Sequence, residues 1–267
     1  MMGAALLAAK SSLKSGVGLV SLGIPESFEL AAVVSVPEAL TLSLPETLSG
    51  SISRRAFKPV ERAHQMRNFD CLAIGPGLSQ HPETGEFLSL VLEMDIPTVM
   101  DADALNLMSQ SPSRFSKIMK KRKSHAILTP HAGEMARCLG ISLSKALSDR
   151  LWCARRLAEK FNSVVVFKGH PSLIVDDNRE IKNPSGDTGL SRGGSGDVLT
   201  GLLCGLWAQN LSSRRLKNVG AFEIAVLGAY LHGVAGDLAQ KELTPYAMTA
   251  QDVISFFPKA FKKICRK

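Results

Sequence analysis

The chain has 267 residues, a formal net charge of +8 and 45% hydrophobic residues. This length allows one large α/β domain or two small ones, and the ordinary globular composition excludes a disordered or fibrous protein. The positive charge suits anionic partners without choosing among nucleotides, nucleic acid and membrane surfaces. The five cysteines include no C-x-x-C pair, which argues against a disulfide framework or zinc site and predicts a reducing, cytoplasmic compartment.

The sequence supports neither a signal sequence nor a membrane-spanning helix. The first nine residues are apolar, but no basic residue precedes them, and Lys10 and Lys14 follow on an amphipathic helical pattern. We therefore interpret this segment as folded protein rather than a signal sequence. The longest apolar stretch, residues 221–238, is interrupted by ionisable side chains, so we expect no membrane span: Glu223, His232 and Asp237.

Short apolar runs alternate with helix-length segments along the chain. The predicted strands are residues 19–24, 71–74, 98–100, 126–128 and 164–167. This alternation predicts an α/β fold with a mostly parallel central sheet flanked by helices. Residues 172–175 and 180–182, joined by a turn at Asp177 and Asn178, predict a small antiparallel hairpin at one edge.

The rest of the chain is predicted to be largely helical, with helices over residues 198–209, 219–238 and 250–264. No linker, repeat or low-complexity tract divides the sequence. We therefore predict a single domain over residues 1–267.

Polar or glycine-rich turns follow four of the predicted strands. They are Gly75-Pro76-Gly77-Leu78, Asp101-Ala102-Asp103-Ala104-Leu105-Asn106, Thr129-Pro130-His131-Ala132-Gly133-Glu134 and Lys168-Gly169-His170-Pro171-Ser172. Ligands of open α/β sheets bind at the carboxyl ends of the strands, so we expect these turns to face one crevice.

The run Gly193-Gly194-Ser195-Gly196-Asp197 stands before an apolar helical segment. Small residues allow backbone amides to point into a concavity, and the start of a helix favours an anion there. Asp197 is placed to accept a proton from a hydroxyl that attacks phosphorus. The run is neither a Walker A loop nor a dinucleotide fingerprint, and a purely structural helix cap is the alternative interpretation.

Seven segments in series resemble the ADP- or ATP-dependent NAD(P)H-hydrate dehydratases, which have a ribokinase-like fold. These segments are GAALLAAKSSLKSGVGLV, GPGL, DADALNL, LTPHAGE, VVVFKG, NPSGDTGLSRGGSGDVLTGLL and YAMTAQDV. The resemblance implies phosphorylation of the C6 hydroxyl of hydrated NADH or NADPH (the S-epimer), followed by elimination of phosphate. It also implies ADP or ATP as phosphoryl donor, Mg²⁺, and a homo-oligomer.

The resemblance also implies a role for individual residues. Asp197 is the expected catalytic base, and Ala4, Gly77, His131 and Asp197 are expected to line the hydrated cofactor. The expected nucleotide-binding residues are Lys168, Gly169, His170, Pro171, Ser172, Gly194 and Gly196. By analogy with other ribokinase-like kinases, Glu134 is expected to hold magnesium through water.

At several of these positions a purely structural role is the alternative to a functional one. Asp101 and Asp103 follow a strand, and we favour helix capping for both over metal binding. Considered alone, His131 follows Thr129 and Pro130 at a predicted helix start and is expected to cap that helix. Its place in the segment TPHAGE favours the role in cofactor binding that the resemblance implies. The basic runs near residues 120–123 and 259–267 lack interleaved aromatics and stand at expected helix ends, so we expect no nucleic-acid partner.

One departure from the family pattern concerns the beginning of the chain. The family usually has an extra strand and a loop ahead of the match to Gly3-Ala4-Ala5, and a fused epimerase domain is often present upstream. The loss of a central strand exposes sheet edges. Two other functions stay open: a small-molecule alcohol kinase of the same fold, acting on a thiazole or pyrimidine precursor, and a catalytically silent nucleotide-binding protein.

Overall fold

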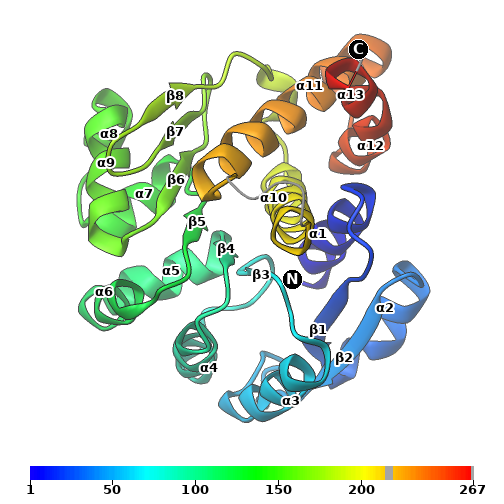
Figure 1. The fold of residues 1–267 in the computed structure, drawn as a ribbon, viewed down its shortest axis with the longest axis vertical. Coiled ribbons are helices and arrows are strands. Elements are labelled where there is room, and N and C mark those ends of the chain that lie inside the picture. The colour runs from blue at the N-terminus through cyan, green and yellow to red at the C-terminus, as the bar shows by residue number, and fades with distance from the viewer. Residues whose placement is uncertain (214–218, 266–267) are drawn as a thin grey trace.

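A six-stranded sheet in the order β3-β4-β5-β6-β7-β8 forms the centre of the fold (Figure 1). The computed structural model describes residues 1–213 and 219–265. The strands are β3 (Leu72–Ile74), β4 (Thr98–Met100), β5 (Ala126–Leu128), β6 (Val164–Phe167), β7 (Leu173–Val175) and β8 (Glu180–Lys182). Strands β3 to β6 are parallel, and β7 and β8 pair antiparallel. The mostly parallel sheet and its edge hairpin are confirmed.

Burial on both faces explains why the central strands are continuous apolar runs. Every residue of β4, β5 and β6 is buried. Met100 and Leu128 belong to the core on one side of the sheet, whereas Val99 and Ile127 belong to the core on the other. A parallel sheet covered on both faces needs apolar side chains at successive positions.

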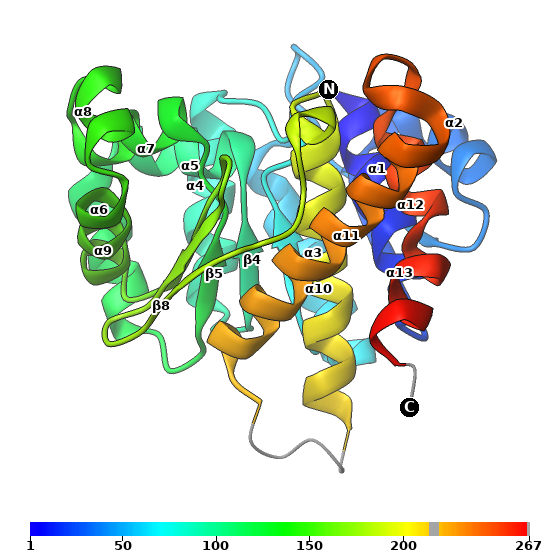
Figure 2. The same ribbon diagram turned by 90° about the horizontal axis from the view of Figure 1, so that it is seen from above.

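Helices cover both faces of this sheet (Figures 1 and 2). One layer contains α4 (Pro82–Glu93), α5 (Ala102–Gln110), α6 (Pro112–Lys121), α7 (Ala132–Leu139), α8 (Leu143–Ser148) and α9 (Arg150–Phe161). The other contains α10 (Ser195–Ser212), α11 (Ala221–Ala247), α12 (Ala250–Ser255) and α13 (Phe257–Ile264). The predicted helix over residues 250–264 is thus two helices, because Pro258 favours a new helix start.

Helix α1 (Met2–Lys14) packs closely along α10. Ser11 Oγ donates a hydrogen bond to Val198 O at 2.5 Å, and Ser12 Oγ donates to Gly201 O at 2.8 Å. A Cβ atom at Gly201 would lie 2.0 Å from Ala8 O, so only glycine allows this approach. These contacts place the second half of α1 along the first two turns of α10 (Figure 2).

Helix α11 is long and apolar enough to cross a membrane by length and composition alone, with a mean hydropathy of 1.2 in its window. Within this fold, 67% of that window is buried, and the helix packs on α10, β5 and β6. Its apolar residues therefore belong to the core of this fold.

The remaining strands form a separate sheet. β1 (Ser21–Pro25) pairs in parallel with β2 (Leu40–Leu44), and neither strand joins the six-stranded sheet. The expectation of one sheet that includes residues 19–24 is therefore wrong, and β2 was not predicted. Helices α2 (Glu29–Ser35) and α3 (Phe57–Arg67) flank this smaller sheet, and three short 3₁₀ turns complete the described fold: Glu26–Phe28, Arg54–Ala56 and Thr188–Leu190.

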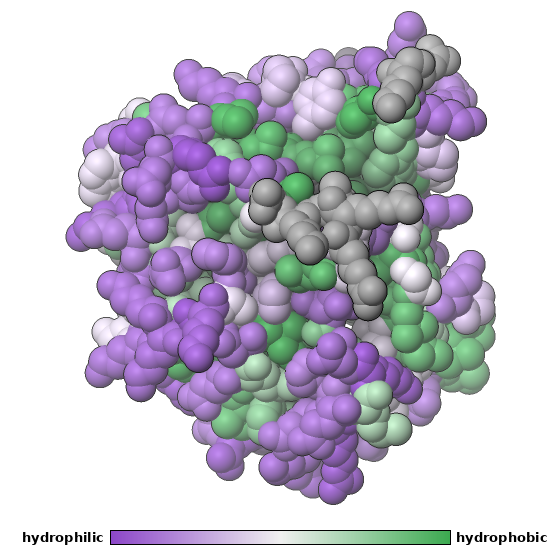
Figure 3. All heavy atoms as spheres, in the orientation of Figure 1, coloured by the Kyte–Doolittle hydropathy of each residue, from purple (hydrophilic) through white to green (hydrophobic). Residues whose placement is uncertain are grey.

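One face of the molecule is mostly hydrophilic on the side of the edge hairpin and carries apolar areas on the opposite side (Figure 3). Helix α2 contributes to the exposed apolar surface, with Leu30 78%, Val33 46% and Val34 73% exposed. Isolated apolar residues on a surface are ordinary, whereas adjacent ones on a single short helix indicate a contact surface.

Candidate active site

The carboxyl ends of β4, β5 and β6 and the start of α10 bring four ionisable side chains together. Asp101 follows β4, Glu134 lies in the first turn of α7 after β5, Lys168 follows β6, and Asp197 lies in the first turn of α10. Lys168 Nζ lies 2.7 Å from Asp101 Oδ1 and 3.8 Å from Glu134 Oε2. The predicted convergence at this edge of the sheet is confirmed for these turns.

Lys168 is the positive centre of this cluster. Burial by itself lowers the pKa of Lys168, but the negative charges of Asp101 and Glu134 outweigh burial and raise it. The ammonium group is therefore charged at neutral pH. Its side chain is 21% exposed, whereas that of Asp101 is 2% exposed, so Lys168 reaches from a buried carboxylate toward solvent.

Asp197 lies in the first turn of α10 and is half-buried. Desolvation, followed by the negative charge of Asp101, raises the pKa of its carboxyl group to about 6, although Lys168 acts in the opposite direction. No donor within residues 1–213 and 219–265 bonds this carboxylate. A carboxylate with this pKa and a free lone pair is suited to accept a proton near neutral pH.

The turn before α10 requires glycine at one position. Gly194 has φ +88°, and a Cβ atom there would lie 2.6 Å from Leu7 Cδ1 and 3.0 Å from Ala250 Cβ. At Gly196, a Cβ atom would lie 3.1 Å from Lys168 Nζ. The small residues thus let the helix start lie close to α1, α12 and the lysine ammonium. Ser195 N donates to Arg192 O at 3.2 Å, and the next amides of α10, at Gly196 and Asp197, remain available to an anion.

His131 and Glu134 form a capping box at the start of α7. His131 Nδ1 accepts a hydrogen bond from Gly133 N at 3.0 Å, and Glu134 Oε2 accepts one from His131 N at 2.8 Å. His131 Nε2 lies 3.2 Å from Glu134 Oε1. The capping interpretation of His131 is confirmed, and its side chain is also 53% exposed beside the cluster.

The loop after β6 is held from below by Arg150 on α9. Arg150 Nη1 donates to Pro171 O at 2.7 Å, and its Nη2 donates to Phe167 O at 3.2 Å. Gly169 has φ +152°, and a Cβ there would lie 2.6 Å from the same guanidinium. Gly169, His170 and Pro171 are exposed, so Arg150 shapes a loop whose outer face is open to solvent.

The first turn of α1 and the loop after β3 meet at the same edge. The Met1 amino group donates to Gly77 O at 3.1 Å, and its positive charge lowers the pKa of Asp197. Gly77 has φ +68°, and a Cβ there would lie 2.1 Å from Met1 O. Ala4 is 7% exposed, so its methyl group is directed into the fold.

Asp101 is the main residue that the sequence interpretation missed. It precedes α5, as expected of a cap, but its side chain makes no capping hydrogen bond. It binds Lys168 instead and accepts a hydrogen bond from Thr200 Oγ1 at 2.9 Å. The capping prediction is therefore wrong for Asp101, because an ammonium group is a stronger partner for a buried carboxylate than a helix amide. Asp103 has a structural role, since it accepts a hydrogen bond from Ser79 N at 2.9 Å.

His232 on α11 is a second residue without a predicted role. It is 7% exposed, and its Nε2 lies 3.4 Å from Ser195 Oγ at the start of α10. Burial lowers the pKa of His232 to about 4, so the ring is neutral at physiological pH. The signal in the sequence was a histidine in the middle of an apolar helical run.

The acidic side chains offer limited direct ligation to a metal ion. Among the described residues, no group of three or more His, Cys, Asp or Glu side chains is arranged to hold one. Both Glu134 oxygens already contact His131, although carboxylates are the hard donors that magnesium prefers. The site therefore fits a hydrated Mg²⁺ ion whose other ligands come from phosphate groups.

Comparison with known proteins agrees with this geometry. A model of the NAD(P)H-hydrate dehydratase family matches residues 1–259. A bifunctional NAD(P)H-hydrate repair enzyme from Moorella thermoacetica is 38% identical over 98% of this chain and 47% of its own length. The chain spans about half the length of this and two other curated repair enzymes that it matches.

Solved structures show the same fold. The ADP/ATP-dependent NAD(P)H-hydrate dehydratase from Bacillus subtilis, co-crystallised with ATP and Mg²⁺, has a TM-score of 0.79 and 29% identity, covering 98% of this chain and 85% of that one. A ribokinase-like protein from Enterococcus faecalis has a TM-score of 0.76 and 24% identity, covering 98% of this chain and 82% of that one, which shows the fold alone. This chain belongs to the NAD(P)H-hydrate dehydratase family and has its ribokinase-like fold.

Proposed function

We propose that this chain restores hydrated NADH and NADPH, the S-epimer, by nucleotide-dependent dehydration. The observation that carries the proposal is the position of Asp197, whose carboxylate stands at the start of α10 with its pKa raised to about 6 beside Lys168. A base with this pKa, next to a cation and an anion-binding helix start, is suited to phosphoryl transfer to an alcohol.

In the first step, Asp197 accepts the proton of the C6 hydroxyl as its oxygen attacks the terminal phosphorus of ADP or ATP. The bond from that phosphorus to the bridging oxygen breaks, and the shortened nucleotide leaves. Lys168 and the amides at Gly194 and Gly196 stabilise the negative charge that moves with the phosphoryl group. Their positions support this role, since a Cβ at Gly196 would lie 3.1 Å from Lys168 Nζ.

In the second step, the ring nitrogen supplies the electron pair that expels phosphate from C6. Loss of a proton from the neighbouring ring carbon then restores the double bond of the reduced nicotinamide. Phosphate is a far better leaving group than hydroxide, so this step demands little from the protein. The donor nucleotide thereby drives a dehydration that leaves no phosphate on the product.

The two substrates approach this edge from opposite sides. Residues 168–172, shaped by Arg150, lie on the exposed loop after β6, which supports contact of Lys168, Gly169, His170, Pro171 and Ser172 with the nucleotide. Met1 joins Gly77 to the start of α1 near Asp197, which supports a cofactor site lined by Ala4, Gly77 and His131.

Magnesium neutralises phosphate charge when it is bound with the nucleotide. Glu134 is the proposed residue for holding the hydrated ion through water, because its side chain is 6% exposed and its oxygens already contact His131. Asp101 holds Lys168 in place beneath the same phosphates.

The test is an assay that separates dehydration from simple phosphorylation. Purified protein is mixed with acid-hydrated NADH, Mg²⁺ and either ADP or ATP, and the absorbance band of reduced nicotinamide is followed together with free phosphate. Recovery of the band with an equal amount of phosphate supports the proposal. A stable phosphorylated product without recovery indicates an alcohol kinase, and nucleotide binding without either product indicates a silent protein.

We further propose that residues 1–267 act as one catalytic domain in a homo-oligomer of the cytoplasm. All five cysteines are free thiols, which supports a reducing compartment. The exposed apolar side chains Leu30 and Val34 on α2 support a contact between subunits. Light scattering of the wild type and of Leu30→Lys tests this contact, since the charged variant is expected to be smaller in solution.

A further inference from the structure

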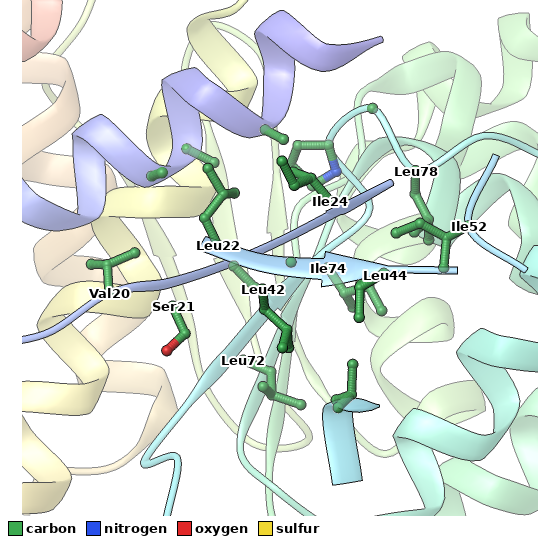
Figure 4. Close-up of a pocket in the computed structure, with 18 of the residues that line it drawn as sticks. Val20, Ser21, Leu22, Ile24, Leu42, Leu44, Ile52, Leu72, Ile74 and Leu78 are labelled. Atoms are coloured by element: carbon green, nitrogen blue, oxygen red, sulfur yellow. The ribbon is translucent and has the colours of Figure 1, made fainter. Parts of the chain in front are cut away.

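The loop after β3 connects an apolar cavity with a group of polar side chains. Ile74 and Leu78 line the cavity of about 600 Å³ that lies between β1 and β3 (Figure 4). Further along the same loop, Ser79 N donates a hydrogen bond to Asp103 Oδ2 at 2.9 Å. Asp103 lies in the first turn of α5, so the loop is tied to this helix at the edge of the sheet that carries the candidate active site.

The polar side chains continue from Asp103 on α5 to Arg137 on α7. Asn106 Nδ2 donates to Asp103 Oδ1 at 3.4 Å, and Arg137 Nε donates to Asn106 Oδ1 at 2.9 Å. The Asn106 amide thus directs its N–H to a carboxylate and its oxygen to a guanidinium, and the reverse orientation satisfies neither partner. Asn106 therefore holds the guanidinium of Arg137 through Nε.

The two outer nitrogens of this guanidinium are free to bind a ligand. Arg137 is exposed, and within residues 1–213 and 219–265 its Nη1 and Nη2 form no hydrogen bond or ion pair. Glu134, one turn earlier on α7, contacts His131 and Lys168 instead. A guanidinium that is held at Nε and free at both Nη atoms presents the planar fork that binds two oxygens of a phosphate group.

Gly133 allows this fork to lie close to His131. A Cβ atom at Gly133 would lie 2.9 Å from His131 Cε1 and 3.5 Å from Arg137 Nη1. The side chain of Arg137 therefore points back along α7 toward the helix start, which is the usual direction of long side chains in helices. The fork thus stands beside the residue that is proposed to line the hydrated cofactor.

The proposed substrate needs a positive charge outside the cluster around Lys168. In that cluster three carboxylates, those of Asp101, Glu134 and Asp197, surround the lysine ammonium group. Hydrated NADH and NADPH carry the two negative charges of a pyrophosphate, which these carboxylates repel. Contacts with such an unreactive part of a substrate supply binding energy and also orient the part that reacts.

We propose that Arg137 binds the pyrophosphate of the hydrated dinucleotide and that Asn106 positions its guanidinium. This inference rests on the proposed function and adds a phosphate subsite to the proposed cofactor site. The pyrophosphate is favoured over the 2′-phosphate of NADPH, because one ribose separates it from the nicotinamide ring whereas the 2′-phosphate lies on the far adenosine. Arg137 stands next to His131, on the side of the site proposed for the reacting ring.

The experiment compares the wild type and Arg137→Gln on three substrates in the recovery assay: hydrated NADH, hydrated NADPH and hydrated dihydronicotinamide riboside, which has no phosphate. For both dinucleotides we expect KM to rise about tenfold to a hundredfold while kcat stays within about twofold, because the contact is equal in the ground and transition states. For the riboside we expect no change in kcat/KM. Arg137→Lys keeps the charge without the fork, so it is expected to recover part of the loss.

Two further variants separate positioning from loss of charge. Asn106→Ala keeps the cation of Arg137 but releases its Nε, so a smaller rise in KM is expected, again only with the two dinucleotides. Arg114→Gln is the matched control, since it removes the same charge from an exposed position on the neighbouring helix α6. It is expected to match the wild type on all three substrates.

Binding of NADH, the product, gives a measurement that needs no turnover. Its fluorescence is titrated with protein in the absence of nucleotide, and Arg137→Gln is expected to raise the Kd of NADH by the same factor as KM. The Kd of ADP is expected to stay unchanged. If the wild type binds NADH but recovers no hydrated cofactor, the proposed function fails, and the NADH titration still tests Arg137.

Four results overturn the inference. An unchanged KM and an unchanged Kd of NADH in Arg137→Gln, or a wild type that does not bind NADH, show that Arg137 holds no part of the dinucleotide. An equal loss with the riboside shows a role in folding or catalysis. A loss confined to hydrated NADPH assigns Arg137 to the 2′-phosphate, and a raised Kd of ADP alone assigns it to the nucleotide.

Discussion

Replacement of Asp101 by asparagine is predicted to move the acid limb of the pH-rate profile. Asp101 Oδ1 binds Lys168, and its Oδ2 accepts a hydrogen bond from Thr200. Asparagine keeps one oxygen for Lys168 and offers its amide to Thr200, whose hydroxyl can turn to accept it. Asp101→Asn therefore removes one negative charge while leaving the local hydrogen bonds in place.

The size of the expected pH displacement follows from the pKa of Asp197. Its pKa is raised from 3.8 to about 6, first by burial and then by the charge of Asp101. This difference penalises the ionised carboxylate by about 3 kcal/mol, so Asp197 destabilises the fold progressively as the pH rises from 3.8 and to the full extent above about 6. Loss of the neighbouring charge is expected to lower the pKa of Asp197 by up to about one unit, which returns about 1.4 kcal/mol.

The assay is kcat/KM as a function of pH, normalised to the plateau above pH 7, since this ratio reports groups of the free enzyme. At about pH 5 the wild type is expected to retain roughly a tenth of its plateau and Asp101→Asn roughly half. The carboxyl carbon of Asp197, followed by NMR, is expected to titrate with the same displacement.

A control separates this effect from general loss of charge. Asp149 forms an exposed ion pair with Lys145, and Asp149→Asn is expected to leave the midpoint at about 6. A midpoint in Asp101→Asn that stays in place or moves to higher pH would show that the charge of Asp101 does not raise the pKa of Asp197.

Three further predictions concern the framework of the site. Gly194→Ala forces a side chain into a left-handed turn against Leu7, so the free energy of unfolding of this variant is expected to fall by about 1–3 kcal/mol in urea titrations. Gly193→Ala is the control and is expected to be tolerated, because a Cβ atom at Gly193 has nothing within 4 Å. Arg150→Ala removes the support beneath residues 168–171, so calorimetry is expected to show nucleotide Kd raised about tenfold with a small change in melting temperature; an unchanged Kd refutes a positioning role. His232 has its pKa lowered to about 4, so stability is lost as pH falls from 6.5 toward 4, and the wild type is expected to lose about 3 kcal/mol more than His232→Gln over this window. Parallel stability curves for the two proteins contradict that assignment.

The sequence was sufficient for the strands that are buried on both faces. The runs at residues 98–100, 126–128 and 164–167 match β4, β5 and β6 because burial on two sides leaves a continuous apolar signal. The hairpin was predictable from Asp177 and Asn178 at its turn. Strand β2 was missed, since its half-covered residues alternate weakly and lie in a separate sheet.

The sequence could not predict which side chains from different elements contact one another. Asp101 stands at a capping position, and only the tertiary approach of Lys168 from another strand redirects its carboxylate. Arg150 acts on backbone oxygens, which carry no sequence signature. The separation of β1 from β3 is likewise a property of pairing, because a strand pattern does not state which edges meet.

The most direct test of the account is the rate of Asp197→Asn in the recovery assay with hydrated NADH. Asparagine preserves the shape of the side chain but cannot accept the hydroxyl proton, so kcat is expected to fall by at least about a hundredfold while nucleotide Kd changes little. Asp177→Asn, on the exposed hairpin turn, is expected to match the wild type. Wild-type turnover in Asp197→Asn would contradict the assignment of Asp197 as the base.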